Sequence, residues 1–164
     1  MELFMNDCLR VSASLRKLCT NLKRDVSYVA LSDSEGLKEL PTKAGIYGIE
    51  TTMPVEELSR ASAVNLGQAK SYVTNKPLLV RQNNKEFYLC YLGTEKSIRA
   101  RLGQHLFNRN VQKNRLGCDL TCSPFSNYEW RVWYYEISDD TIRYAVESWW
   151  RANIEWPPFC ERSN

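Results

Sequence analysis

Short strand-like segments, separated by stretches of helical composition, are the feature that most constrains the fold of this chain. Three of them cover residues 44–50, 86–92 and 128–137, and the run 78–81 could form a further short strand. A mixed order of few strands and several helices is typical of α+β proteins. We therefore expect an α+β fold with a small, mainly antiparallel three-stranded sheet flanked by helices.

Helical composition returns at four places along the chain. Apolar residues recur at helical spacing over residues 3–24, and residues 55–74 begin after a proline with two acidic residues in the first turn. Residues 95–108 carry an apolar line at every fourth position, and a last helix follows the cap sequence 139–141 and runs to about residue 154.

These elements fit one domain over residues 1–164, because a chain of this length is one ordinary domain. Within it, we expect an N-terminal helical extension over residues 1–30. A helical insertion over residues 52–85 separates the first two predicted strands. Gly93-Thr94 is expected to end the strand over residues 86–92.

The charge of the chain is unevenly distributed. Residues 60–117 carry eleven Lys or Arg and two acidic residues, a net charge of +9, whereas the whole chain has only +3. A basic segment in an otherwise acidic chain is expected for a protein that binds a polyanion. A solvated lysine-rich surface would give the same pattern, so charge alone does not decide between them.

Six cysteines suggest either a disulfide framework or a metal site. The closest pair is Cys118-x3-Cys122, and the chain has one histidine, which is a loose match to zinc ligand spacing. The N-terminus lacks the basic start and apolar stretch of a signal peptide. We therefore expect a cytoplasmic protein with reduced, mostly buried thiols.

A small set of residues has the types and spacing of a catalytic site. Gly45-Ile46-Tyr47 lies in one predicted strand, and Tyr91-Leu92-Gly93 lies at the end of another. Arg101 and His105 are one helical turn apart, so they project on neighbouring parts of one helix face. Glu147 lies on the last predicted helix.

This pattern resembles the signature of the GIY-YIG nuclease family. In that family Gly-Ile-Tyr and Tyr-(Ile/Val/Leu)-Gly lie on two strands, a helix carries Arg and often His, and a later helix carries Glu with Asn after it. The matching positions here are Gly45, Ile46, Tyr47, Tyr91, Leu92, Gly93, Arg101, His105, Glu147 and Asn164. The resemblance covers residues 44–164, with Gly45, Gly93 and Asn164 as supporting positions.

Phosphodiester hydrolysis explains why such residues would be grouped. The reaction needs a nucleophile in line with the leaving group and relief of the charge that grows on the phosphoryl oxygens. Glu147 can hold Mg²⁺, which accepts few protein ligands and for which Mn²⁺ can substitute. Arg101 can clamp a phosphate with two parallel hydrogen bonds. The resemblance favours Tyr47 as general base or proton relay, with Tyr91 and His105 positioning phosphate and water.

The resemblance implies a divalent-metal-dependent endonuclease that hydrolyses phosphodiester bonds of double-stranded DNA. A compact single domain favours a sequence-specific restriction enzyme, which could act as a homodimer. A nuclease toxin or a repair-type nicking nuclease belongs to the same enzyme class. A non-catalytic DNA-binding or adaptor domain on this scaffold is the alternative from another class.

The basic segment indicates where DNA would lie. Five residues on and after the helix of Arg101 are the expected DNA contacts: Lys96, Arg99, Arg109, Lys113 and Arg115. The sequence has no run of eighteen apolar residues, so we expect no membrane span.

Overall fold

The fold is described here from a computed structural model. It describes residues 12–21, 26–62, 79–82, 84–108, 115–154 and 156–160. Half of the expected insertion over residues 52–85 lies outside the described residues, namely residues 63–78 and residue 83. Within the described part of the chain, none of the helices has the length and apolar character needed to cross a membrane.

The described residues form a five-stranded sheet, where the sequence predicted three strands. Its order is β1-β5-β2-β4-β3, and all neighbouring strands are antiparallel. The three predicted strands form its centre as β2 (Gly45–Thr51), β4 (Lys85–Glu95) and β5 (Trp130–Glu136). The α+β class and the antiparallel pairing are confirmed, and the strand number is corrected.

The two additional strands lie at the edges of the sheet. Strand β3 (Leu79–Gln82) pairs with β4 and matches the short run that the sequence suggested. Strand β1 (Tyr28–Ala30) pairs with β5 and was not predicted. Three residues are too few to show the alternation by which a strand is recognised in a sequence.

Strand β4 also continues past Gly93, which corrects the prediction that Gly93-Thr94 ends it. Gly93 pairs with Tyr47 of β2, and Thr94 pairs with Ile46. Glycine is needed here for close packing and not for a turn, since a β-carbon at Gly93 would lie 2.7 Å from the Tyr47 hydroxyl oxygen. The long β4 places Tyr91 to Thr94 beside residues 46–49 of β2.

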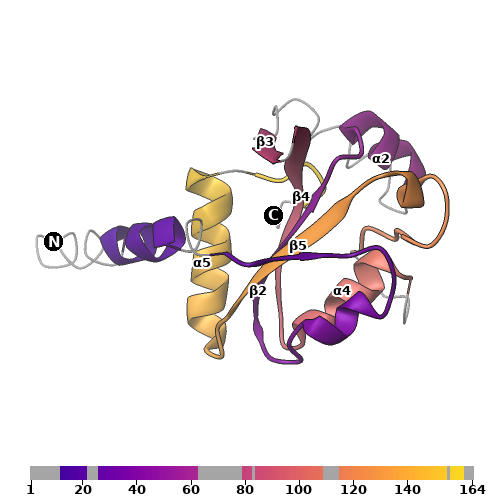
Figure 1. The fold of residues 1–164 in the computed structure, drawn as a ribbon. Helices are drawn as coiled ribbons and strands as arrows, with labels where there is room; N and C mark the ends of the chain where they lie inside the picture. Colours follow the sequence, from indigo (N-terminus) through magenta and orange to yellow (C-terminus); the bar gives the residue numbers. More distant parts are fainter. Residues whose placement is uncertain are drawn as a thin grey trace, which may run out of the picture.

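Helices cover both faces of the sheet. Helix α4 (Ile98–Leu106) and helix α5 (Asp140–Asn153) lie on opposite sides of it (Figure 1). Successive side chains of a strand point to opposite faces, so Ile46 and Tyr47 enter different cores. Tyr47 packs in the core that α4 covers, and Ile46 packs in the core that α5 covers.

The remaining predicted helices are described in part. Residues 12–21 are helical, inside the expected range 3–24, and α2 (Val55–Ala61) begins where the insertion helix was expected. The predicted cap of the last helix is confirmed, because the Asp139 carboxylate accepts a hydrogen bond from the Ile142 backbone N–H at 2.9 Å. Two short 3₁₀ helices, η1 (Gly36–Glu39) and η2 (Phe125–Asn127), lie in the connecting loops.

Candidate active site

Four of the five predicted catalytic side chains meet on the face of the sheet that α4 covers. Tyr47 comes from β2, Tyr91 from β4, and Arg101 and His105 from α4. The ring centroids of Tyr91 and His105 are 4.3 Å apart, and those of Tyr47 and Tyr91 are 6.2 Å apart. The pairing of Tyr47 with Gly93 brings the two strand signatures together, and Gly93 leaves room for the Tyr47 hydroxyl.

His105 is enclosed by the protein, with no exposed surface. Its Nδ1 accepts a hydrogen bond from the Leu116 backbone N–H at 3.0 Å, and its Nε2 lies 3.0 Å from the Tyr47 hydroxyl oxygen. Burial, followed by the charges of Arg101 and Arg115, holds the pKa of His105 well below its ordinary value, so the ring is neutral.

These contacts fix the tautomer of the ring. A nitrogen that accepts from a backbone N–H carries no proton, so the proton of the neutral ring is on Nε2. Nε2–H therefore donates to the Tyr47 oxygen. Both ring nitrogens are bonded within the protein and the ring reaches no solvent, so the predicted role of His105 in positioning phosphate and water would act through Tyr47.

The Tyr47 hydroxyl is the centre of this cluster. The side chain is 1% exposed, and burial is the largest influence raising the pKa of Tyr47 well above that of a free phenol. The negative charge of Glu147 also raises it, whereas the charge and hydrogen bond of Arg101 lower it. The phenol therefore keeps its proton, while two N–H donors face its oxygen.

Arg101 links the two tyrosines. Burial raises the pKa of Tyr91 to about 12, against a lowering by the nearby charge of Arg101. Arg101 is half-buried, and its Nη1 donates to the Gln104 side-chain oxygen at 2.6 Å. A planar guanidinium in this place can present N–H groups to an anion as well as to the phenols.

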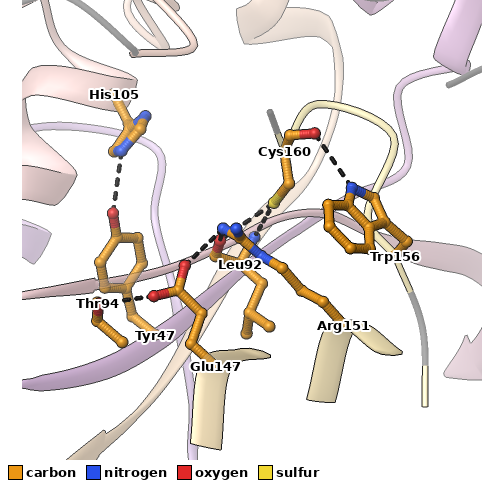
Figure 2. Close-up of polar contacts among 8 residues, drawn as sticks. All are labelled: Tyr47, Leu92, Thr94, His105, Glu147, Arg151, Trp156 and Cys160. Atoms are coloured by element: carbon orange, nitrogen blue, oxygen red, sulfur yellow. Dashed lines mark hydrogen bonds and ion pairs between the residues drawn. The ribbon is translucent and has the colours of Figure 1, made fainter. Parts of the chain in front are cut away.

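Glu147 reaches the same stretch of β4 from the other helix. Its carboxylate accepts from Thr94 Oγ1 at 2.7 Å and pairs with Arg151 Nη2 at 2.5 Å. Figure 2 shows this carboxylate between Thr94 and Arg151, with the Tyr47–His105 hydrogen bond nearby. Its charge is one of the influences on the pKa of Tyr47. The structure thus places Tyr47, Tyr91, Arg101 and His105 on the α4 side of the sheet and brings Glu147 to Thr94 of β4 from the α5 side.

Two residues of this site were not predicted. Thr94 directly follows Tyr91-Leu92-Gly93, and Arg151 is four residues after Glu147 on one helix face. The i,i+4 spacing of Glu and Arg is a recognisable sequence signal for an ion pair. Nothing in the sequence shows that the same Arg151 Nη2 also donates to the Leu92 carbonyl at 2.7 Å, since that contact depends on the packing of α5 against β4.

The residues that we expect to contact DNA differ in their exposure and in their hydrogen bonds within the protein. Lys96 is exposed, and Arg115 is half-buried with its Nη1 donating to the Asn108 side chain at 3.0 Å. Arg99 instead donates to the carbonyls of Leu40 at 2.7 Å and Lys38 at 2.9 Å. It therefore fastens α4 to the η1 loop, and its contact with DNA stays a prediction.

Three predicted positions lie outside the described residues: Arg109, Lys113 and Asn164. In the part of the chain that is described, Cys19, Cys90, Cys118 and Cys160 are buried free thiols and Cys122 is an exposed one. The described residues contain no group of three or more His, Cys, Asp or Glu side chains arranged to hold a metal ion. A metal at this site would depend on the Glu147 carboxylate.

A cavity of about 580 Å³ lies at another part of the sheet. Its walls include Tyr28 of β1, Phe87 of β4 and Arg131 of β5, and none of the five predicted catalytic residues lines it. The polar cluster around Tyr47 is therefore separate from this cavity.

Comparisons with known proteins assign no family to this chain. No protein-family model matches the chain, and the searches of curated proteins and of solved structures give no significant match.

Proposed function

We propose that this protein is a divalent-metal-dependent endonuclease of the GIY-YIG type that hydrolyses phosphodiester bonds of double-stranded DNA. The observation that carries the proposal is the grouping of Tyr47, Tyr91, Arg101 and His105 beside the Glu147 carboxylate. A nuclease needs these types of group together, and the residues come from segments separated by up to a hundred positions in the chain.

Arg101 binds the scissile phosphate in this proposal. Its guanidinium lies close enough to the phenols of Tyr47 and Tyr91 for each to influence the pKa of the other. A phosphoryl group beside these phenols could accept two parallel hydrogen bonds from the planar Arg101 guanidinium and a further one from a phenol hydroxyl. Arg101 then offsets the negative charge that develops on the phosphoryl oxygens.

Tyr47 would act as general base in its anionic form: the phenol first loses its own proton to solvent, and the phenolate then takes up the proton of the attacking water. His105 Nε2–H and the Arg101 guanidinium both face its oxygen, and donors stabilise the anionic form of a phenol. His105 is a fixed donor, because it accepts from Leu116 through Nδ1 and cannot take the phenol proton through Nε2. Offsetting the charge of Glu147 would remove one of the influences that raise the pKa of Tyr47.

Glu147 would hold the metal ion, with Thr94 fixing the carboxylate. The residues fit Mg²⁺, because this ion keeps several waters and one carboxylate can suffice as protein ligand. Mn²⁺ accepts the same kind of oxygen ligand. When bound, the ion supplies Lewis-acid stabilisation of the phosphoryl oxygens and a lowered pKa for a coordinated water.

Cleavage of supercoiled plasmid by the purified chain tests this function. We expect cutting in Mg²⁺ or Mn²⁺ and none in chelator, with Glu147→Gln inactive under all conditions. A restriction enzyme gives discrete linear fragments, a nicking enzyme gives open circles, and a toxin degrades the plasmid without preferred sites. Sedimentation of the chain in the presence of duplex DNA tests whether it cuts as a homodimer. DNA binding without any cleavage would support a non-catalytic adaptor and overturn the proposal.

A further inference from the structure

The carboxylate of Glu147 already forms an ion pair with the guanidinium of Arg151. Arg151 Nη2 lies 2.5 Å from Glu147 Oε1, and Thr94 Oγ1 donates to Oε2 at 2.7 Å, so both oxygens are engaged (Figure 2). The side chains of Glu147 and Arg151 are each 14% exposed. This is a pair largely removed from water, where charges act more strongly on one another than at the surface.

Arg151 is held in place by more than the carboxylate. The same Nη2 donates to the Leu92 carbonyl at 2.7 Å, and the guanidinium carbon lies 5.7 Å from the centre of the Trp156 ring. The Cys160 thiol, which also contacts the Leu92 backbone, lies close enough to Arg151 to raise the pKa of its guanidinium. These anchors keep the positive charge beside the site even when the contact to Glu147 is broken.

A divalent ion at Glu147 would lie next to the positive charge of Arg151. Mg²⁺ binds carboxylate oxygens at roughly 2.0–2.1 Å, so an ion held by Glu147 would compete with Arg151 Nη2 for Oε1. The anchored guanidinium would also repel an ion bound next to it. Thr94 does not compete in the same way, because its hydroxyl is neutral and bonds the other carboxylate oxygen.

We propose that Arg151 competes with the metal ion for the Glu147 carboxylate. It pairs with this carboxylate while the ion is absent, and it lowers the affinity of the site for divalent cations. This inference rests on the proposed function, because it takes Glu147 as the metal ligand. Arg151 is a positioning residue in this scheme. It keeps the buried carboxylate compensated and oriented, and its Nη2 must leave Oε1 before an ion binds there.

Direct binding of Mn²⁺ to the full chain tests the inference without measuring cleavage. Free Mn²⁺ is followed by electron paramagnetic resonance for the wild type and for Arg151→Gln, which removes the charge and keeps a hydrogen-bonding side chain. We expect Arg151→Gln to bind Mn²⁺ about tenfold more tightly, or more, which corresponds to ~1.4 kcal/mol. Arg151→Lys keeps the charge and should bind close to the wild-type level.

Two controls separate this inference from the proposed function. Glu147→Gln should lose the site, and Lys43→Gln, which removes an exposed cation paired with Glu136, should leave it unchanged. If Glu147→Gln loses binding but Arg151→Gln binds no tighter than wild type, the inference is overturned and the metal site stands. If Glu147→Gln binds Mn²⁺ as the wild type does, the proposed metal site is overturned, and the inference with it.

A second measurement uses the wild-type chain, in case Arg151→Gln does not fold. The side-chain Nε–H resonance of Arg151 is followed by NMR as Mg²⁺ is added. We expect it to shift with the same saturation curve as the metal-induced shift of the Thr94 backbone amide. A saturating Thr94 shift with an unmoved Arg151 resonance would show that the ion binds without displacing Nη2 and would overturn the inference.

Discussion

Two largely buried glutamate–arginine pairs lie along the sheet and differ in what surrounds them. Glu50 of β2 pairs with Arg131 of β5, and their side chains are 7% and 6% exposed. The Arg131 guanidinium carbon lies 4.1 Å from the ring centres of both Tyr28 and Phe87. Aromatic faces on a cation stabilise it where it stands and leave it little freedom to exchange partners.

The pair of Glu147 and Arg151 is arranged differently. It is twice as exposed as the first pair, and its neighbours are the Thr94 hydroxyl, the Leu92 carbonyl and the Trp156 ring, whose centre lies 5.7 Å from the guanidinium carbon. The same two residue types therefore form a contact held between two aromatic rings in one place and, in our proposal, a contact that gives way to a metal ion in the other. The comparison teaches that the surroundings of an ion pair, and not its chemistry or its distance, indicate whether it can serve a reaction.

The largest effect expected from this comparison is a separation of activity from stability. Glu147→Gln should reduce DNA cleavage by about 10³-fold or more, because several kcal/mol of transition-state stabilisation depend on the metal. Its free energy of unfolding should fall less than that of Glu50→Gln, because Arg151 keeps its contacts with Leu92 and Trp156. Glu50→Gln should leave the activity of the folded protein intact and lower the free energy of unfolding by about 3 kcal/mol, since it leaves the Arg131 charge buried and uncompensated.

Cleavage rates and urea unfolding of both variants measure the two effects. If Glu147→Gln is as active as wild type, the carboxylate has no catalytic role. If Glu50→Gln unfolds like wild type but cleaves poorly, the assignment of the two pairs is reversed.

Tyr47 and Tyr88 offer a matched pair of buried phenols. The Tyr88 hydroxyl is buried with no hydrogen-bond partner among the described residues, whereas that of Tyr47 faces His105 and Arg101. Tyr47→Phe should slow cleavage by about 10²- to 10⁴-fold, the usual contribution of a general acid–base group. Tyr88→Phe should keep the rate and be neutral or slightly stabilising, because it removes an unsatisfied polar group.

Single-turnover cleavage and urea unfolding separate these two variants. A Tyr47→Phe protein that cleaves at the wild-type rate would make Tyr47 a core residue like Tyr88.

Acid should change the contributions of His105 and Glu50 to the free energy of unfolding in opposite directions. His105 is the only histidine, and its pKa in the folded state is well below its ordinary value. The unfolded chain therefore binds a proton that the folded chain does not. Stability from this group is present above pH ~6.5 and falls by about 1.4 kcal/mol per pH unit as the pH decreases below that value. The pKa of Glu50 is raised, mainly by burial, so acid between its raised and ordinary values stabilises the fold instead.

Urea unfolding between pH 7 and pH 5 measures the acid response of His105. His105→Gln should remove the slope below pH ~6.5, whatever its effect on stability at pH 7. A wild-type chain whose stability does not change over this range would contradict the neutral, buried state of His105.

The central part of the fold was predictable because local signals were strong. Strands β2, β4 and β5 are rich in aromatic and β-branched residues, and the Asp139 cap marks the start of α5. Strand β1 was missed because it has only three residues and owes its conformation to pairing with β5. Gly93 was misread as a strand end, because a glycine that admits a side chain from a neighbouring strand looks in the sequence like a turn glycine.

The candidate site was predictable in its members but not in its contacts. The spacing of Arg101 and His105 follows from helix periodicity and could be derived. That His105 turns both nitrogens inward depends on the Leu116 backbone, which reaches it from a later loop. Arg99 was expected at the DNA and instead binds two carbonyls near η1, because a net charge does not say which cations the fold itself uses.

The smallest expected effect compares Arg115 with Arg99 in salt-dependent DNA binding. Arg115 follows α4, and its side chain donates a hydrogen bond to the side chain of Asn108. The side chain of Arg99 instead donates to the backbone carbonyls of Leu40 and Lys38. Each phosphate contact adds about 0.9 to the slope of log affinity against log salt. Arg115→Ala should therefore lower the slope by about one contact and weaken binding to all sequences alike. Arg99→Ala should leave the slope unchanged and lower the melting temperature. If Arg99→Ala changes the slope and Arg115→Ala does not, DNA approaches the η1 side of α4, and the path past Arg115 is wrong.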